Sequence, residues 1–253
     1  TYHPVVEILS PGQPTVSEAQ LERLAKIPFE VIWGAVRAQN YENCCYAGLQ
    51  STRPSQRVVG RALTIRYLPR RPDLGNAMQD LAQKGDWPSG YHVRAAEEVK
   101  PGQILVVDLG GEIDTGVFFG DISAMAAAKS GAKAVILWGA TRDLAELRLM
   151  EEIPVFARGF HPNPALQIGV DWNIPIRVGG ATVIPGDIVV AEEEAVMFFP
   201  PSILEKVLER AERYSLQEEF EREKVREGKY RFRDIYPLNK ELREEFEKKY
   251  PQK

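Results

Sequence analysis

The feature that most constrains the fold of this sequence is a fully apolar run, Ala134–Trp138, set between two helix patterns. The small-residue segment before it, Ile122–Ser130, ends at Gly131, and glycine commonly closes a helix in the left-handed conformation. The segment after it, Arg142–Met150, carries a second helix pattern. A strand that is apolar throughout has both faces buried, as in parallel sheets covered by helices. We therefore predict an α/β fold.

A second pattern occurs twice along the chain. The segment Val99–Asp108 resembles Val183–Glu192, and each contains a Pro-Gly turn that leads into an apolar strand. The β-rich segment Val58–Tyr67 predicts a further strand. We expect a core that contains several sheets.

Both ends of the chain have helical patterns. Ser17 is placed to cap one helix, and a second short helix is expected over Phe29–Arg37. From Pro201 onward, charges of alternating sign accompany a narrow apolar stripe, which predicts a long charged helical tail interrupted at residues 229–237. The predicted division of the chain is a helical lead-in (residues 1–47), an α/β domain (48–210) and a helical C-terminal extension (211–253).

Composition and charge narrow the class of protein. The 253 residues include 32 lysines and arginines against 36 aspartates and glutamates, for a net charge of −4. Nucleic-acid binders take most of their affinity from basic residues that neutralise phosphates, so we expect no nucleic-acid partner. The adjacent Cys44 and Cys45 do not readily pair with each other, which favours a reducing, cytoplasmic location. Because Thr1–Pro4 shows no leader pattern and the apolar runs are short, we expect no membrane role.

Residues that carry chemistry gather between Gly120 and Glu146. The segment Gly120–Ser123 begins a predicted helix, and the unpaired backbone N–H groups of a helix start can receive a carboxylate or an oxyanion. An ordinary helix cap at Asp121 explains the same local pattern equally well.

A second candidate group follows the apolar strand, where ligands commonly bind in α/β sheets. Arg142 can hold a substrate carboxylate in a bidentate fork, and Asp143 can ligate a hard cation. A helix that begins with a favourable acidic residue is the simpler explanation of this pair taken alone. Glu146, one turn later, is most simply an ion-pair partner that orients Arg142.

The two groups together resemble a known family. Twenty residues separate Asp121 from Arg142, which gives the signature Asp121-x20-Arg142-Asp143-x2-Glu146. This signature resembles that of the RraA-like family. Further segments resemble the same family and occur in the same order along the chain: Gly120–Ala124, Pro154–Gly159, Val178–Gly180 and Pro185–Ala191. The family includes 4-hydroxy-4-methyl-2-oxoglutarate/4-carboxy-4-hydroxy-2-oxoadipate aldolases, oxaloacetate decarboxylases and the regulator of ribonuclease E activity. The resemblance covers about residues 48–210.

The resemblance implies a swivelling β/β/α fold that assembles as homotrimers or dimers of trimers, with sites between subunits. It implies a lyase that needs Mg²⁺ or Mn²⁺ and that cleaves or decarboxylates a small 2-oxo acid through a pyruvate enolate. By motif position, Asp143 would ligate the metal largely through waters, and Arg142 would bind the substrate. Asp121 would position or deprotonate a water, and the backbone N–H groups of Ile122 and Ser123 would hold the pyruvyl carboxylate. The predicted substrate-binding residues are Gly120, Ile122, Ser123, Trp138 and Arg142, with Glu146 in support.

Two departures from the family pattern bear on the substrate. Trp138 stands where many members carry a small or polar residue, and the loop His161–Pro164 replaces one that usually carries a cation. Two alternatives stay open: a non-catalytic binding protein of the ribonuclease-regulator type, and a different enolate reaction such as hydration or isomerisation. Retention of the whole acidic and basic signature favours the enzyme, because a surface-binding protein has no physical need for it.

Overall fold

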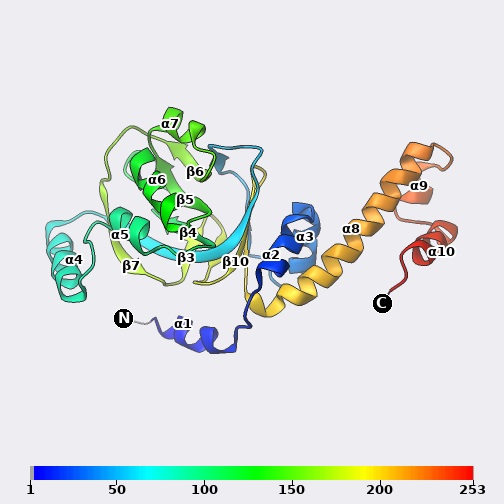
Figure 1. Ribbon diagram of the computed structural model, residues 1–253, viewed down its shortest axis with the longest axis horizontal. Coiled ribbons are helices and arrows are strands. Elements are labelled where there is room, and N and C mark those ends of the chain that lie inside the picture. Colours follow the sequence, from blue (N-terminus) through cyan, green and yellow to red (C-terminus); the bar gives the residue numbers. More distant parts are fainter. Residues whose placement is uncertain (1–2, 253) are drawn as a thin grey trace.

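The structure is a computed structural model that describes residues 3–252, so Thr1, Tyr2 and Lys253 lie outside the described residues. Its centre is a nine-stranded sheet in the order β1-β11-β10-β3-β4-β5-β6-β2, with β7 also paired to β3 (Figure 1). A separate two-stranded sheet joins β8 to β9. The strands are β1 (Cys45–Tyr46), β2 (Gln50–Ser51), β3 (Val58–Pro69), β4 (Gln103–Asp108), β5 (Ala134–Thr141), β6 (Val155–Phe160), β7 (Gln167–Trp172), β8 (Ile176–Val178), β9 (Ala181–Val183), β10 (Ile188–Ala191) and β11 (Val196–Phe199).

Helices cover the sheet and extend the chain at both ends. They are α1 (Pro4–Leu9), α2 (Glu18–Ala25), α3 (Phe29–Arg37), α4 (Pro72–Gly85), α5 (Tyr91–Glu98), α6 (Asp121–Ser130), α7 (Leu144–Leu149), α8 (Leu204–Glu227), α9 (Phe232–Ile235) and α10 (Lys240–Lys249). None of the helices within residues 3–252 is long and apolar enough to cross a membrane.

The predicted α/β centre is confirmed. Strands β3, β4, β5 and β6 run parallel to one another. On one face, α5 and α6 bury their small and apolar residues against the sheet, and the opposite face packs against β8 and β9. Gly131 closes α6 with a φ of +109°, as the sequence predicts. The apolar strand β5 is therefore buried from both sides.

The repeated Pro-Gly turn is also confirmed, and its two copies meet at one strand. Gly102 and Gly186 have φ angles of +86° and +84°, a region that favours glycine. The first turn leads into β4, parallel to β3, and the second into β10, antiparallel to β3 on its other side. Arg61 on β3 donates its backbone N–H to Gly102 O at 3.1 Å and its Nε to Gly186 O at 2.7 Å. The repeat thus builds two sides of one sheet, where we expected several sheets.

The N-terminal helices form part of the core. Ser17 caps α2 in a capping box, as predicted. Helices α2, α3 and the first half of α8 share one apolar cluster with β10 and β11. Arg23 on α2 joins Glu212 on α8 through Nε and Oε1 at 2.7 Å. Residue 210, after which we expect the extension to begin, lies inside the continuous helix α8.

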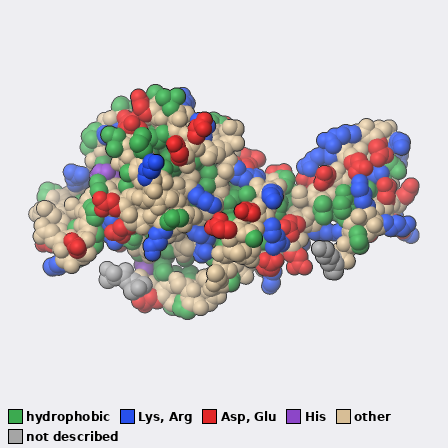
Figure 2. Space-filling model, viewed as in Figure 1, with side chains coloured by type: hydrophobic (Ala, Val, Ile, Leu, Met, Phe, Trp, Pro, Cys, Tyr) green, Lys and Arg blue, Asp and Glu red, His purple; other side chains and the backbone are tan. Residues whose placement is uncertain are grey.

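The second half of α8 leaves the body of the molecule and carries a small helical lobe, residues 214–252 (Figure 1). Helices α9 and α10 pack against α8 around Phe220, Leu242 and Phe246. Figure 2 shows basic and acidic side chains interspersed over this lobe. Its surface therefore has the mixed charge of a solvated helical face.

Several elements were not predicted from the sequence, and two of them lie near the candidate site. We expected neither a helix at α5 nor a strand at β7. The N-cap residue of helix α5 is Gly90, which offers no side-chain cap, and β7 is an edge strand with Gln167 and Asp171 among its residues. Such elements depend on tertiary contacts, here on α6 and on the far half of β3.

Candidate functional site

The site is assembled where β5 ends and α6 begins. Thr141, the last residue of β5, donates its buried hydroxyl to Phe119 O at 2.9 Å. The backbone N–H of Arg142 points at the same oxygen at 3.4 Å. These contacts hold the segment before α6 against the end of β5. The first turn of α6 therefore lies beside Arg142 and Asp143.

Asp143 adopts a strained conformation and joins the two halves of the site. Its φ of +60° is uncommon for a residue with a side chain, and such strain clusters at functional sites. Its Oδ2 accepts a hydrogen bond from the backbone N–H of Asp121 at 3.3 Å. The same oxygen lies 3.6 Å from Nε of Arg142. Asp143 stands at the N-cap position of its own helix, α7, but its side chain makes no capping hydrogen bond there and instead caps the neighbouring helix α6.

Gly120 makes this approach sterically feasible. A Cβ on Gly120 would lie 1.9 Å from Oδ2 of Asp143, far inside van der Waals contact. Gly120 is also the N-cap residue of α6, so Asp121 occupies the first helical position and does not cap the helix. The structure thereby decides against an ordinary cap at Asp121.

The open helix start provides unpaired donors. The backbone N–H groups of Ile122 and Ser123 lie in the first turn of α6, which receives no side-chain cap from Gly120. The Ile122 side chain is 78% exposed, so the helix start faces outward. The binding of a carboxylate by these N–H groups stays a prediction.

The expected pair between Arg142 and Glu146 is absent among residues 3–252. The helix α7 begins only at Leu144, so Arg142 lies before it and the i, i+4 spacing of a helix does not apply. Arg142 contacts Asp143 instead, and both side chains are about two-fifths exposed (42% and 37%). The expectation for Glu146 was therefore wrong.

Trp138 is not brought into this cluster. Side chains alternate along β5, and Leu137 joins the core beneath α6 while Trp138 packs in the cluster on the opposite face. Its ring lies 5.1 Å from that of Tyr46 and 5.3 Å from the guanidinium of Arg158. The prediction that Trp138 contacts the substrate has no support in this arrangement.

One residue near the site was missed by the sequence interpretation. His92, at the start of α5, is half-buried. Burial and, to a smaller extent, the positive charge of Arg142 lower its pKa. The sequence shows only three scattered histidines, so no local signal places His92 within electrostatic reach of Arg142.

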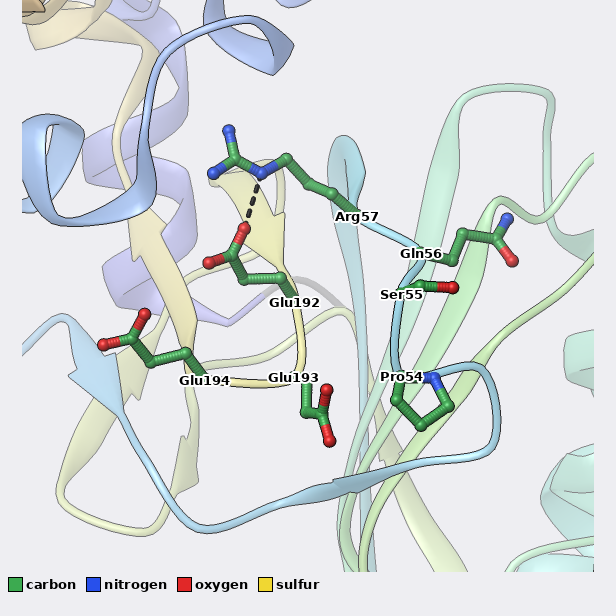
Figure 3. Close-up of a pocket in the computed structure, with 7 residues that line it drawn as sticks. All are labelled: Pro54, Ser55, Gln56, Arg57, Glu192, Glu193 and Glu194. Atoms are coloured by element: carbon green, nitrogen blue, oxygen red, sulfur yellow. Dashed lines mark hydrogen bonds and ion pairs between the residues drawn. The ribbon is translucent and has the colours of Figure 1, made fainter.

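A different pocket, of about 470 Å³, lies at the loop between β10 and β11 (Figure 3). Three consecutive glutamates, Glu192–Glu194, line it together with the segment 54–57, and Figure 3 shows Glu192 directed toward Arg57. Arg57 joins Glu192 through Nε and Oε2 at 2.6 Å and also donates to the carbonyls of Ala25 and Ile27. The arginine therefore ties the end of α2 to the sheet, which is a structural role.

The structure is an α/β sheet with an arginine, two aspartates and a helix start gathered at the end of one strand. A family model described as RraA-like, Aldolase/RraA, matches residues 14–198, and the chain belongs to this family.

Two relatives and one solved structure are similar to this chain. Protein DlpA of Legionella pneumophila is 29% identical over 177 residues, which are 68% of this chain and 26% of that protein. A 4-hydroxy-4-methyl-2-oxoglutarate aldolase of Thermus thermophilus is 33% identical over 110 residues, which are 42% of this chain and 65% of that protein. The match thus covers less than two thirds of either relative. The structure of Streptomyces coelicolor RraAS2, described as an unusual member of the RNase ES inhibitor RraA family, has a TM-score of 0.70 at 22% identity over 83% of this chain and all of that chain. This likeness shows the shared fold.

Proposed function

We propose that this protein is a divalent-metal-dependent lyase that cleaves or decarboxylates a small 2-oxo acid through the enolate of pyruvate. The observation that carries the proposal is the position of Asp143, whose carboxylate bridges the start of α6 and Arg142 in a strained conformation. A purely structural helix cap needs neither the strain nor the arginine. The named aldolase among the relatives supports the choice of reaction class.

The chain's own residues divide the chemistry between them. The N–H groups of Ile122 and Ser123 bind the carboxylate next to the 2-oxo group, at the positive end of α6. Arg142 holds the substrate near the bond that breaks and stabilises negative charge on the oxo oxygen. Asp121, half-buried at the first position of α6, takes the proton of the C4 hydroxyl through a water. As that proton leaves, the C3–C4 bond breaks and its electron pair moves onto the pyruvyl fragment.

The residues fit Mg²⁺ or Mn²⁺. Residues 3–252 contain no cluster of three or more histidine, cysteine or acidic side chains placed to hold a metal ion, so Asp143 would be the single carboxylate ligand and waters would complete the site. Both contacts of Asp143 use Oδ2, so Oδ1 is left to face a cation. Mg²⁺ binds through one or two carboxylates and keeps several waters, which suits such a sparse donor set. When bound, the ion supplies Lewis-acid stabilisation of the charge that develops on the 2-oxo group.

We also propose that a second copy of the chain covers the site, in a homotrimer or a pair of trimers. Three large apolar side chains next to the site are exposed: Ile122 by 78%, Met125 by 54% and Leu149 by 83%. Figure 2 shows hydrophobic side chains gathered over α6 and α7. Exposed apolar patches commonly mark protein interfaces. Sedimentation would report a trimer or hexamer, and Met125→Glu with Leu149→Glu would shift it toward the monomer; a monomeric parent protein would contradict this assembly.

A reducing, cytoplasmic location belongs to the proposal. Cys44 and Cys45 are free and half-buried, and burial raises the pKa of both thiols to about 11. Such thiols are poor nucleophiles at neutral pH, so we expect no catalytic role for them.

The test is pyruvate release from oxaloacetate and from 4-hydroxy-4-methyl-2-oxoglutarate, with Mg²⁺ or Mn²⁺ and again with EDTA. We expect pyruvate from at least one acid, lost with EDTA and strongly reduced in Arg142→Ala. Asp80→Asn, on the exposed face of α4, is the control variant, because it changes the charge of the protein by one unit away from the site. If a folded oligomer releases no pyruvate from either acid in the presence of Mg²⁺ or Mn²⁺, the lyase proposal is overturned and the binding-protein alternative is favoured.

A further inference from the structure

A groove of about 380 Å³ lies on the helical lobe, between the second half of α8 and the short helix α9. Three of the side chains that line it are apolar and exposed: Val225 by 51%, Phe232 by 69% and Tyr236 by 53%. The rings of Phe232 and Tyr236 stack, with their centroids 5.9 Å apart. A single exposed apolar residue is ordinary, whereas a group of them around one groove marks an interaction surface.

The body of the same chain does not cover this groove. Ala211 is the last residue of α8 in the apolar cluster shared with β10 and β11. Val225 lies on the same helix, about 21 Å farther along at 1.5 Å per residue. No glycine or proline interrupts α8 between these two residues, so the helix holds the lobe away from the sheet (Figure 1). A molecule that fills the groove is therefore another copy or another partner.

The charges at the groove are ordered along α8. Glu218 lies toward the body of the molecule, and Arg226 lies two turns farther out. Arg226 is exposed and has no ion pair among residues 3–252. Glu218 accepts a hydrogen bond from Arg222 through Oε2 at 2.7 Å, and its Oε1 has no partner in the described part of the chain. The groove thus has unused negative capacity at its inner end and an unused positive charge at its outer end.

We propose that this groove binds the same groove of a second copy of the chain, with the two α8 helices antiparallel across a two-fold axis. In that arrangement Arg226 of each copy meets Glu218 of the other, because one symmetry operation makes both contacts. The side chains of Val225, Phe232 and Tyr236 pack between these two ion pairs.

The order of the charges favours a second copy over an unrelated partner. A groove with charges of one sign calls for a partner of the opposite sign, whereas this groove is complementary to itself when one copy is reversed. Arg222, halfway between Glu218 and Arg226, comes close to the axis, where Glu218 of its own chain neutralises it. The groove therefore carries balanced charge when it is paired.

The size of the contact fits a reversible association. A fully buried aromatic side chain covers about 150–250 Å², so the exposed apolar side chains and their charged neighbours offer roughly 500–600 Å² per copy. Two copies then bury about 1,000–1,200 Å², at the low end of specific interfaces. We therefore expect the pair to dissociate on dilution.

This contact is separate from the one proposed around Ile122, Met125 and Leu149, and it needs neither metal nor turnover. It doubles whatever assembly the bodies form. If the bodies form trimers, pairing of the lobes gives a hexamer, and its loss gives a trimer. If the bodies do not associate, the same pairing gives a dimer, and its loss gives a monomer. Failure of the trimer proposal and failure of this one therefore give different masses.

Charge reversal in two separate copies tests the antiparallel pairing. Glu218→Arg sets two cations against each other across the axis, and Arg226→Glu sets two carboxylates against each other. We expect either variant alone to have half the mass of the parent protein in sedimentation equilibrium, with a dissociation constant raised roughly tenfold or more. An equimolar mixture of the two variants restores opposite charges at both ends of the contact, so we expect the mixture to recover the mass of the parent protein.

The controls reverse charges elsewhere on the lobe. Arg243 and Glu244 are exposed on α10, do not line the groove and have no ion pair among residues 3–252. We expect Arg243→Glu and Glu244→Arg to keep the mass of the parent protein. Recovery on mixing excludes misfolding, because misfolded variants do not repair each other. Equal masses for the parent protein and both single reversals, a mixture that stays at half the mass, or an equal loss in the controls would each overturn the proposal.

Discussion

Two arginine–carboxylate pairs in this molecule serve opposite purposes. Arg57 and Glu192 meet at 2.6 Å, and the remaining donors of Arg57 satisfy carbonyls at the end of α2. Arg142 and Asp143 meet at 3.6 Å, in a strained turn, beside a helix start with open donors. The first pair uses its hydrogen-bonding capacity within the chain. The second pair leaves hydrogen-bonding groups free for a ligand. This difference distinguishes a structural ion pair from a candidate binding site.

The largest expected effect is on the second pair. Asp143→Asn keeps the size and the hydrogen bond to Asp121 but removes the charge. We expect the rate of pyruvate release to fall roughly 10²–10³-fold, the range found when one charge-stabilising group is removed. Urea unfolding should change by less than about 1 kcal/mol, which excludes a folding defect. Near-normal rates with saturating metal would refute the role of Asp143.

A third carboxylate, Asp187, is buried and has no ion pair among the described residues, in contrast to Glu192 and Asp143. It accepts from the backbone N–H of Ile184 at 2.9 Å, while nearby Arg61 donates its Nε to Gly186 O. Burial raises the pKa of Asp187 from 3.8 to about 7. The folded state then holds a proton that the unfolded chain releases near pH 4, so stability falls as pH rises from about 4 to 7. We expect a loss of about 2–3 kcal/mol between pH 5 and pH 8 from this group.

Asp187→Asn tests that linkage. The amide oxygen still accepts from Ile184 and carries no charge, so this part of the pH dependence should disappear. Urea unfolding at pH 5 and pH 8 measures it, with Asp80→Asn as the exposed control. An equal slope in the parent protein and in Asp187→Asn would show that the carboxylate is ionised in the folded state.

Breaking the structural pair should affect stability alone. Arg57→Ala leaves Glu192 and two carbonyls at the end of α2 without their partner, and both charged side chains are only 21% exposed. We expect a loss of roughly 1–2 kcal/mol in urea unfolding. The rate per folded molecule should stay the same. If Arg57→Ala lowers the rate of pyruvate release without lowering the free energy of unfolding, the pocket of Figure 3 has a functional role.

The smallest expected effect is at Glu146. It lies in α7, is exposed, and has no ion pair among the described residues. We expect Glu146→Gln to change stability by less than about 0.5 kcal/mol and the rate by less than about twofold. A loss comparable to that of Asp143→Asn would restore the orienting role that the sequence suggested.

The fold was predictable where local pattern and burial agree. The apolar strand β5, the small-residue helix α6 with Gly131, and the Pro-Gly turns before β4 and β10 each carry their own signal. The edge strand β7 and the helix α5 carry none, because polar residues interrupt the first and no capping side chain marks the second.

By itself, the sequence determined the sheet, the family and the spacing that brings Asp121 toward Arg142, since hydrophobic period and glycine turns act locally. Only the tertiary structure decided that Asp143 caps α6 and that Arg142 turns from Glu146. It also decided that Trp138 faces the opposite side of the sheet. Side-chain partners depend on which elements meet in space, and that contact is set by packing between segments distant in the sequence.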